Sequence, residues 1–202
     1  MEVYPELAAT IEKAKTLPLS EERKKVLQEL IDYIQSKKES GSPVQLNFIC
    51  THNSRRSQLS QIWAQTMAYL HGFTIFSYSG GVEVTAFNER AVAAVERSGF
   101  KTSAEGAANP KVAVKYSDNA DPIIAFSKTY DDKANPERGF AAVMTCSHAD
   151  ENCPYISGAE ARIPVRYEDP KAFDGTDQEA EKYDERSLQI ASEMIYVFSN
   201  IK

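Results

Sequence analysis

Hydrophobic residues recur at two different spacings along the chain, and the change between them predicts a helical segment followed by alternating strands and helices. Between residues 5 and 38 the apolar positions follow a helical period. Pro18 divides this segment into two helices, because proline lacks a backbone donor and breaks a helix. From residue 44 onward, short apolar runs alternate with amphipathic segments. Apolar runs bounded by turn residues are typical of buried strands, so this part is predicted to be an α/β unit.

The apolar runs also indicate where the individual elements lie. Strands are predicted at 44–50, 73–79, 123–127, 141–145 and 161–166, and helices at 57–70, 88–98 and 178–199. Strands that alternate with helices predict a parallel sheet covered on both faces. Residues 130–139 are polar and rich in turn formers. They therefore predict that the short strands on either side of them form an inserted hairpin.

Residues 1–41 are expected to form a helical extension ahead of a main domain that spans 42–202. Ser20 can cap the second helix, and Glu21 and Glu22 in its first turn favour that helix through the helix dipole. Apolar side chains line one face of this helix, so the extension needs a partner surface. We expect it either to pack onto the main domain or to form a homodimer contact.

Composition and charge exclude several classes of function. The chain has 202 residues, 42% of them hydrophobic, which supports a sizeable core and argues against disorder. Its formal net charge of −6 disfavours nucleic acid as a partner, because phosphate binding needs a basic surface. The absence of a membrane-spanning run and of signal-peptide features predicts a cytoplasmic protein. Three cysteines, Cys50, Cys146 and Cys153, then favour redox, catalytic or metal chemistry over a disulfide scaffold.

The stretch CTHNSRRSQ, Cys50 to Gln58, lies between a predicted strand and a predicted helix. The amides of such a loop and the N-terminus of the next helix converge on an anion site. Arg56 adds a planar fork of donors that suits a tetrahedral oxyanion. The same donors would stabilise a Cys50 thiolate, and the Ser57 hydroxyl can donate a hydrogen bond to its sulfur. Cys50 is therefore predicted to be a nucleophile aimed at the central atom of a bound oxyanion.

This loop resembles the Cys-x5-Arg-Ser loop of low-molecular-weight protein tyrosine phosphatases and of the arsenate reductases that share their fold. The segments SQIWAQ and YSGGVE extend the resemblance, which covers roughly residues 44–202. It implies a central parallel four-stranded sheet flanked by helices. By resemblance, the active site would contain Cys50, Arg56 and Ser57, and the oxyanion-binding loop Thr51, His52, Asn53, Ser54 and Arg55.

Cys146 and Cys153 distinguish the two branches of this family. Thioredoxin-coupled arsenate reductases carry a cysteine pair at this spacing after a central strand, whereas the phosphatases do not require one. In a helix the two Cα atoms would lie ~10.5 Å apart along the axis, but a disulfide needs less than about 7 Å. A disulfide between them would thus require the segment to unwind, as in a redox switch. Two unrelated thiols, or a zinc site of Cys146, His148 and Cys153, are the alternatives.

The resemblance also assigns the proton donor. Asp169, followed by Pro170, would be the general acid that protonates the leaving oxygen, with Glu168 as its neighbouring competitor. Phosphatases of this type follow the Asp-Pro pair with two tyrosines that grip an aromatic substrate. Here Lys171, Ala172 and Phe173 follow, which disfavours a phosphotyrosine specialist.

Other positions near the loop leave alternatives open. His52 stands where glycine is often found, and we expect a structural role because histidine tolerates left-handed backbone. Arg55 either raises the local positive potential or is solvated, and Asn53 is expected to hold the loop by hydrogen bonds. Some reductases of this family bind potassium through an acidic residue whose position here is Gln61, so this ion stays an open question.

The resemblance implies reduction of arsenate to arsenite. Cys50 attacks arsenic, Cys146 forms a disulfide with Cys50 as arsenite leaves, and Cys153 moves the disulfide to 146–153. Thioredoxin would supply the reducing equivalents, and no tightly bound cofactor is expected. Two alternatives are a low-molecular-weight phosphatase acting on phosphotyrosine or small phosphoesters, and a non-catalytic oxyanion or redox sensor.

Overall fold

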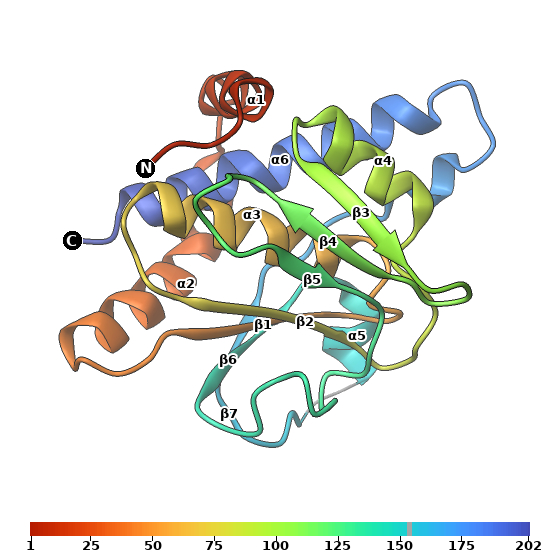
Figure 1. Cartoon of the computed structure of the whole chain (residues 1–202). Helices are drawn as coiled ribbons and strands as arrows, with labels where there is room; N and C mark the ends of the chain where they lie inside the picture. The colour runs from red at the N-terminus through yellow and green to blue at the C-terminus, as the bar shows by residue number, and fades with distance from the viewer. Residues whose placement is uncertain (153–154) are drawn as a thin grey trace.

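The computed structural model describes residues 1–152 and 155–202, and it confirms the predicted α/β architecture (Figure 1). Four parallel strands form the central sheet in the order β2-β1-β6-β7. Their bounds are Gln45–Cys50 for β1, Phe76–Gly81 for β2, Phe140–Met144 for β6 and Ala159–Pro164 for β7. The two central strands, β1 and β6, are buried at every position except Gln45. A strand with neighbours on both sides and both faces covered must be apolar throughout, which explains the continuous apolar runs in the sequence.

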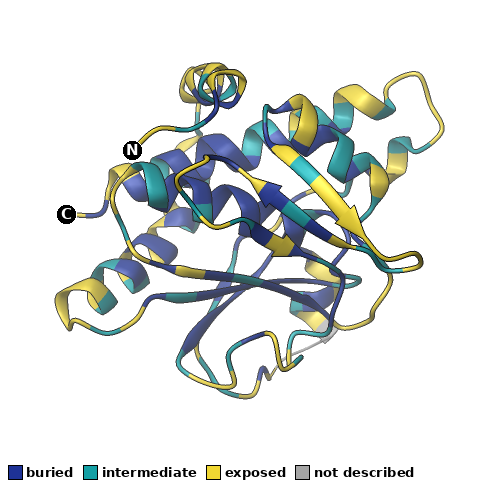
Figure 2. Ribbon diagram, in the orientation of Figure 1, coloured by how far each residue is buried: buried dark blue, intermediate teal, exposed yellow. Residues whose placement is uncertain are grey.

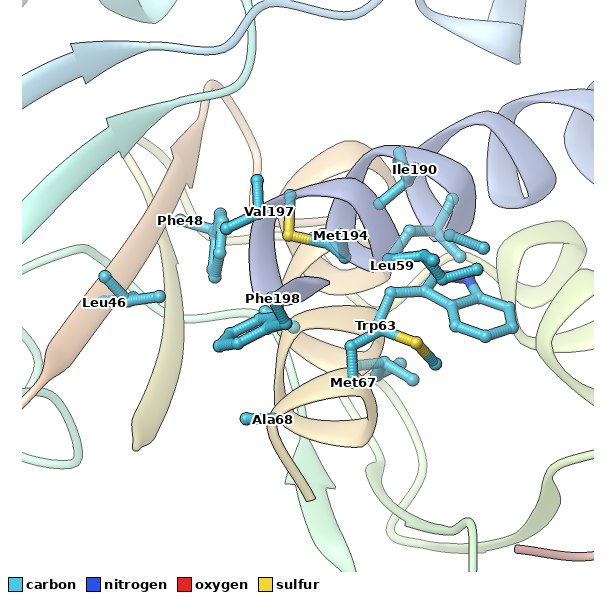
Figure 3. Packing of buried hydrophobic residues seen from close by; sticks show 14 of the residues in the cluster. Leu46, Phe48, Leu59, Trp63, Met67, Ala68, Ile190, Met194, Val197 and Phe198 are labelled. Atoms are coloured by element: carbon cyan, nitrogen blue, oxygen red, sulfur yellow. The ribbon is translucent and has the colours of Figure 1, made fainter. Parts of the chain in front are cut away.

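Helices pack against this sheet and against one another. They are α3 (Arg56–Leu70), α4 (Glu89–Arg97), α5 (Ser147–Asn152) and α6 (Glu179–Ser199), with a short 3₁₀ helix η1 at Pro170–Phe173. The helix α3 contacts β1, β2 and α6, and Figure 3 shows its Trp63 and Met67 beside Met194 and Phe198 of α6. Trp63 is fully buried, and its indole N–H donates to Ser187 Oγ at 3.0 Å. This bond satisfies the one polar group that the indole brings into the core.

An insertion is present, but the hairpin predicted from residues 123–127 and 141–145 is wrong. The strands β3 (Lys101–Glu105), β4 (Lys111–Lys115) and β5 (Ile123–Ala125) form a separate antiparallel sheet in the order β3-β4-β5, whereas β6 belongs to the main sheet. Segment 130–139 connects the two sheets, and the Asn135 amide pins it to the Ser79 carbonyl of β2 at 3.0 Å. The sequence pattern missed β3 because its side chains are mostly exposed and show no apolar alternation.

The first 41 residues form two helices, α1 (Pro5–Lys15) and α2 (Glu21–Glu39). The predicted cap is confirmed, since Ser20 Oγ accepts the Arg23 N–H at 3.1 Å. The apolar side chains of both helices belong to the same buried cluster as those of the sheet. The division into an extension and a main domain therefore stays a prediction, as does a homodimer contact.

Burial is highest in the central sheet and α3, and the outer faces of α1 and β3 are exposed (Figure 2). No helix in the described part of the chain is long and apolar enough to cross a membrane.

Candidate active site

The two described cysteines lie at the same edge of the central sheet, where the parallel strands have their carboxyl ends. Cys50 is the last residue of β1, and Cys146 follows β6, whose Met144 pairs with Ile49 of β1. Both thiols are free and belong to one buried cluster. Because ligands of open α/β sheets bind beyond the carboxyl ends of the strands, this edge is where a site is expected.

The loop between Cys50 and α3 turns its backbone carbonyls outward. The carbonyls of residues 51–54 accept hydrogen bonds from groups outside the loop, among them the Val82 and Glu83 amides on Thr51 O, the Ser127 hydroxyl on His52 O and the Asn88 amide on Ser54 O. A loop whose carbonyls point away from its centre leaves its amides free to face inward. Together with the start of α3 at Arg56, these amides form the donor set that an oxyanion needs.

Asn53 holds the loop in shape, as predicted, and it is also the residue with left-handed backbone, at φ 46°. The expectation that His52 adopts this conformation is wrong. Asparagine tolerates it because its short polar side chain bonds locally. Asn53 Oδ1 accepts the Lys128 N–H at 3.1 Å, and its Nδ2 donates to Ser57 Oγ at 2.9 Å. His52 instead lies 3.3 Å from the Glu83 carboxylate.

The predicted contact between Cys50 and Ser57 is present, with Sγ and Oγ 3.1 Å apart. Because Asn53 already donates to this hydroxyl, the hydroxyl proton is available to the sulfur. A hydrogen bond from Ser57 favours the thiolate, which is the nucleophilic form of cysteine.

Asp169 lies against two arginines of the loop. Arg55 Nε contacts its Oδ1 at 2.8 Å, and an Arg56 terminal nitrogen contacts its Oδ2 at 2.9 Å. Burial raises the pKa of this carboxyl, but the charges of Arg56 and Arg55 outweigh burial and hold it below its ordinary value. Asp169 is therefore ionised in the ligand-free protein. The alternative that Arg55 is solvated is wrong, because its side chain is only 10% exposed and binds Asp169.

Arg56 also donates to the Tyr167 carbonyl at 3.0 Å, which fixes its guanidinium at the mouth of the loop. Its Nε is buried and has no acceptor among the described residues. A buried donor without a partner is costly, and a bound oxyanion would satisfy it.

Cys146 touches the same loop. Its Sγ lies 3.5 Å from Thr51 Oγ1, and the Ala149 N–H donates to it at 3.4 Å. The helix α5 begins at the next residue, so residues 147–152, which separate Cys146 from Cys153 in the sequence, are helical. Cys153 lies outside the described residues, and its role and the zinc alternative that includes it stay predictions.

An open cavity of about 530 Å³ adjoins the outer side of the loop. His52, Ser54 and Arg55 line one wall, and the turn between β3 and β4 supplies Ala107 and Pro110 to another. The inserted sheet thus borders the approach to the site. At Gln61, compared above with a potassium ligand, the amide donates to Ser77 O at 3.0 Å, and the question of a potassium ion stays open.

Sequence comparison identifies the family. An arsenate reductase of Bacillus cereus is 30% identical over 123 residues, which cover 61% of this chain and 74% of that relative. The chain belongs to the arsenate reductase family. An arsenate reductase of Halalkalibacterium halodurans is 29% identical over 132 residues, covering 65% of this chain and 78% of the relative. No known family profile matches the chain.

Solved structures confirm the fold of this arsenate reductase family member. A low-molecular-weight phosphotyrosine phosphatase of Vibrio cholerae O395 aligns with a TM-score of 0.52 at 14% identity, over 78% of this chain and 95% of that one. Primo-1 aligns with a TM-score of 0.51 at 12% identity, over 78% and 97%. At these identities the likeness shows the shared fold alone.

Sequence reasoning missed three contacts at this reductase-family site. Arg55 binds Asp169, 114 positions away; His148 lies 3.3 Å from Thr51, 97 positions away; and the Lys128 backbone anchors Asn53. These contacts join segments that are distant in the sequence, so no local spacing of residues predicts them. The one available signal is the second arginine of the loop, which a purely oxyanion-binding role leaves unexplained.

Proposed function

We propose that this protein reduces arsenate to arsenite, with Cys50 as the nucleophile and Cys146 as the second thiol. The observation that supports this proposal best is the place of Cys146, buried at the same sheet edge as Cys50 and in contact with the Cys50 loop through Thr51. A phosphatase needs the loop and an acid but no second thiol. A reductase needs a second sulfur within reach of the first.

In the first step, the Cys50 thiolate forms a bond to arsenic, and one oxygen leaves as water after taking a proton from Asp169. In the second, the Cys146 thiolate attacks Cys50 Sγ. A disulfide forms, the sulfur–arsenic bond breaks, and its electron pair stays on arsenic, which is thereby reduced from As(V) to As(III). Cys153 would then attack Cys146, and a dithiol carrier, expected to be thioredoxin, would reduce the final disulfide. Action in the cytoplasm stays part of this proposal.

The two arginines support a link between substrate binding and the state of the acid. Arg56 now binds the carboxylate of Asp169, and an arsenate that takes up this guanidinium withdraws positive charge from the carboxylate. The negative charge of arsenate adds to this effect, so the pKa of Asp169 rises when substrate is present. Arg55 keeps Asp169 at the loop meanwhile, because its contact does not depend on Arg56. Asp169 would thus become an acid when arsenate binds.

The test is arsenate-dependent NADPH consumption by purified protein with thioredoxin and thioredoxin reductase, run beside hydrolysis of p-nitrophenyl phosphate. We expect turnover in the first assay that is abolished by Cys50→Ser, Cys146→Ser and Cys153→Ser. Phosphate ester hydrolysis, if present, should need Cys50 and survive the other two substitutions. Multi-turnover reduction by the Cys146→Ser variant would refute the proposed sequence of disulfide exchanges. Ester hydrolysis without any arsenate reduction would move the protein to the phosphatase branch.

A further inference from the structure

The thiol of Cys146 has to lose its proton before it can attack, and its surroundings restrict how this can happen. Its residue is 1% exposed, so water does not reach the sulfur directly. The described residues offer the sulfur two hydrogen-bond partners, the Ala149 N–H and the Thr51 hydroxyl. Of these two, only the hydroxyl can accept a proton and pass one on, because an amide N–H is a donor alone.

The Thr51 hydroxyl is also in contact with a base. His148 Nδ1 lies 3.3 Å from Thr51 Oγ1, and His148 is exposed to solvent. A buried thiol, a hydroxyl and an exposed imidazole therefore form one continuous chain from Cys146 to water. Histidine is the side chain whose ordinary titration range suits proton exchange near neutral pH.

We propose that His148 accepts the proton of Cys146 through the Thr51 hydroxyl. This inference rests on the proposed reductase function, because it concerns the second thiol of that reaction. The thiol proton passes to Thr51 Oγ1 while the Thr51 hydroxyl proton passes to Nδ1 of a neutral His148. The products are a Cys146 thiolate and an imidazolium, which returns its proton to water. The Ala149 N–H, already directed at the sulfur, stabilises the thiolate.

Other ionisable groups lie near the hydrogen bonds that join Cys146, Thr51 and His148, but their described contacts are with different partners. Asp150 of α5 is held by Arg162 and Arg166, with the Arg162 terminal nitrogen 2.6 Å from Oδ1. On the loop side, the charged or titratable groups are Cys50, His52 with Glu83, Arg55 and Arg56 with Asp169. Among the contacts described here, only His148 shares a hydrogen-bond partner with Cys146.

The experiment isolates Cys146 in the full chain by combining Cys50→Ser with Cys153→Ser, which leaves it as the sole thiol. Thiolate ultraviolet absorbance is then followed over time after a rapid rise in pH, with and without His148→Gln. Glutamine keeps hydrogen-bonding atoms but cannot take up a proton. We expect thiolate formation to be about tenfold slower in His148→Gln, because the buried thiol loses the group that accepts its proton. His71→Gln, at a histidine outside the site, is the matched control.

A double-variant comparison separates a proton relay from a merely structural role. In a Thr51→Val background the proton relay is already broken, so His148→Gln should not slow thiolate formation further. Thr51→Ser, which keeps the hydroxyl, should behave like the parent. An unchanged rate of thiolate formation in His148→Gln, or an equal further slowing by His148→Gln in the Thr51→Val background, would overturn the proposal. A variant that fails to fold is recognised by its circular dichroism, and the Thr51→Ser and Thr51→Val pair then decides the question.

In the protein with all three cysteines, His148→Gln should slow arsenite release in a single turnover about tenfold. Alkylation of Cys50 should stay unchanged. The measurement of thiolate formation does not involve arsenate, so its outcome stands even if the reductase activity proves wrong. Conversely, normal arsenite release in His148→Gln would refute the proton relay through Thr51 and leave the reductase proposal intact.

Discussion

Replacing Lys128 by methionine should stabilise the protein near neutral pH. The Lys128 residue is only 4% exposed, and its ammonium lies 4.5 Å from the centre of the Phe126 ring. Burial lowers the pKa of Lys128 from 10.5 to about 8, and the charge of Asp132 offsets this only in part. At about 1.4 kcal/mol per pH unit, this difference corresponds to about 3 kcal/mol of cost for keeping the charge in the fold. The ring contact returns up to about 1 kcal/mol, so Lys128→Met should gain about 2–3 kcal/mol.

The pH dependence of this gain follows from the direction of the pKa change. Between about pH 8 and 10.5 the unfolded chain holds a proton on Lys128 that the folded protein has lost. Unfolding therefore binds protons, and the stability of the wild type rises with pH across this window. The advantage of Lys128→Met should accordingly be full below pH 8 and shrink as the pH approaches 10.5.

The assay is urea unfolding under reducing conditions, followed by the fluorescence of the single, buried tryptophan, Trp63. It is run at about pH 7 and at about pH 10. Lys133→Met is the matched control. Lys133 is exposed and lines the same surface cavity as Lys128, and its loss should change stability by less than about 0.5 kcal/mol. The reasoning is refuted if Lys128→Met gives no gain near neutral pH, or if its gain is equal at the two pH values.

Three further substitutions test contacts that hold the fold and the site. Glu193→Gln should cost about 3 kcal/mol in the same urea assay, because Glu193 is fully buried and its loss leaves the charge of Arg23, now 2.7 Å away, without its partner. Gly99→Ala should cost about 2 kcal/mol or more and speed hydrogen exchange in α1, since φ is +97° and the new methyl would lie 2.2 Å from Leu7 N. Folding lowers the pKa of Asp169 below its ordinary value of 3.8, so this carboxylate stabilises the wild type above pH 3.8, and the stabilisation is lost as the pH falls below that value. Asp169→Asn should lack this pH-dependent stabilisation. Equal acid unfolding of the two proteins would contradict this.

The sequence by itself determined the parts of this protein that depend on neighbouring residues. The apolar runs of β1 and β6 predicted central strands, because strands covered on both faces must be apolar at every position. The order strand, Cys50 loop, helix predicted an anion site, because a loop that leads into a helix N-terminus presents its amides together. The contact of Cys50 with Ser57 followed as well, since seven residues that turn into a helix bring both side chains to one point.

Only the tertiary structure decided which distant groups meet at that loop. The inserted sheet escaped prediction although β5 lies within the strand predicted at 123–127, because β3 is mostly exposed and shows no apolar alternation. The partner of Arg55 and the neighbour of Thr51 come from segments about one hundred positions away. Long-range packing, rather than any local pattern, sets these contacts. The physical reason is that local spacing fixes the conformation of a segment, whereas the state of Asp169 and of Cys146 depends on charges and donors brought from other elements.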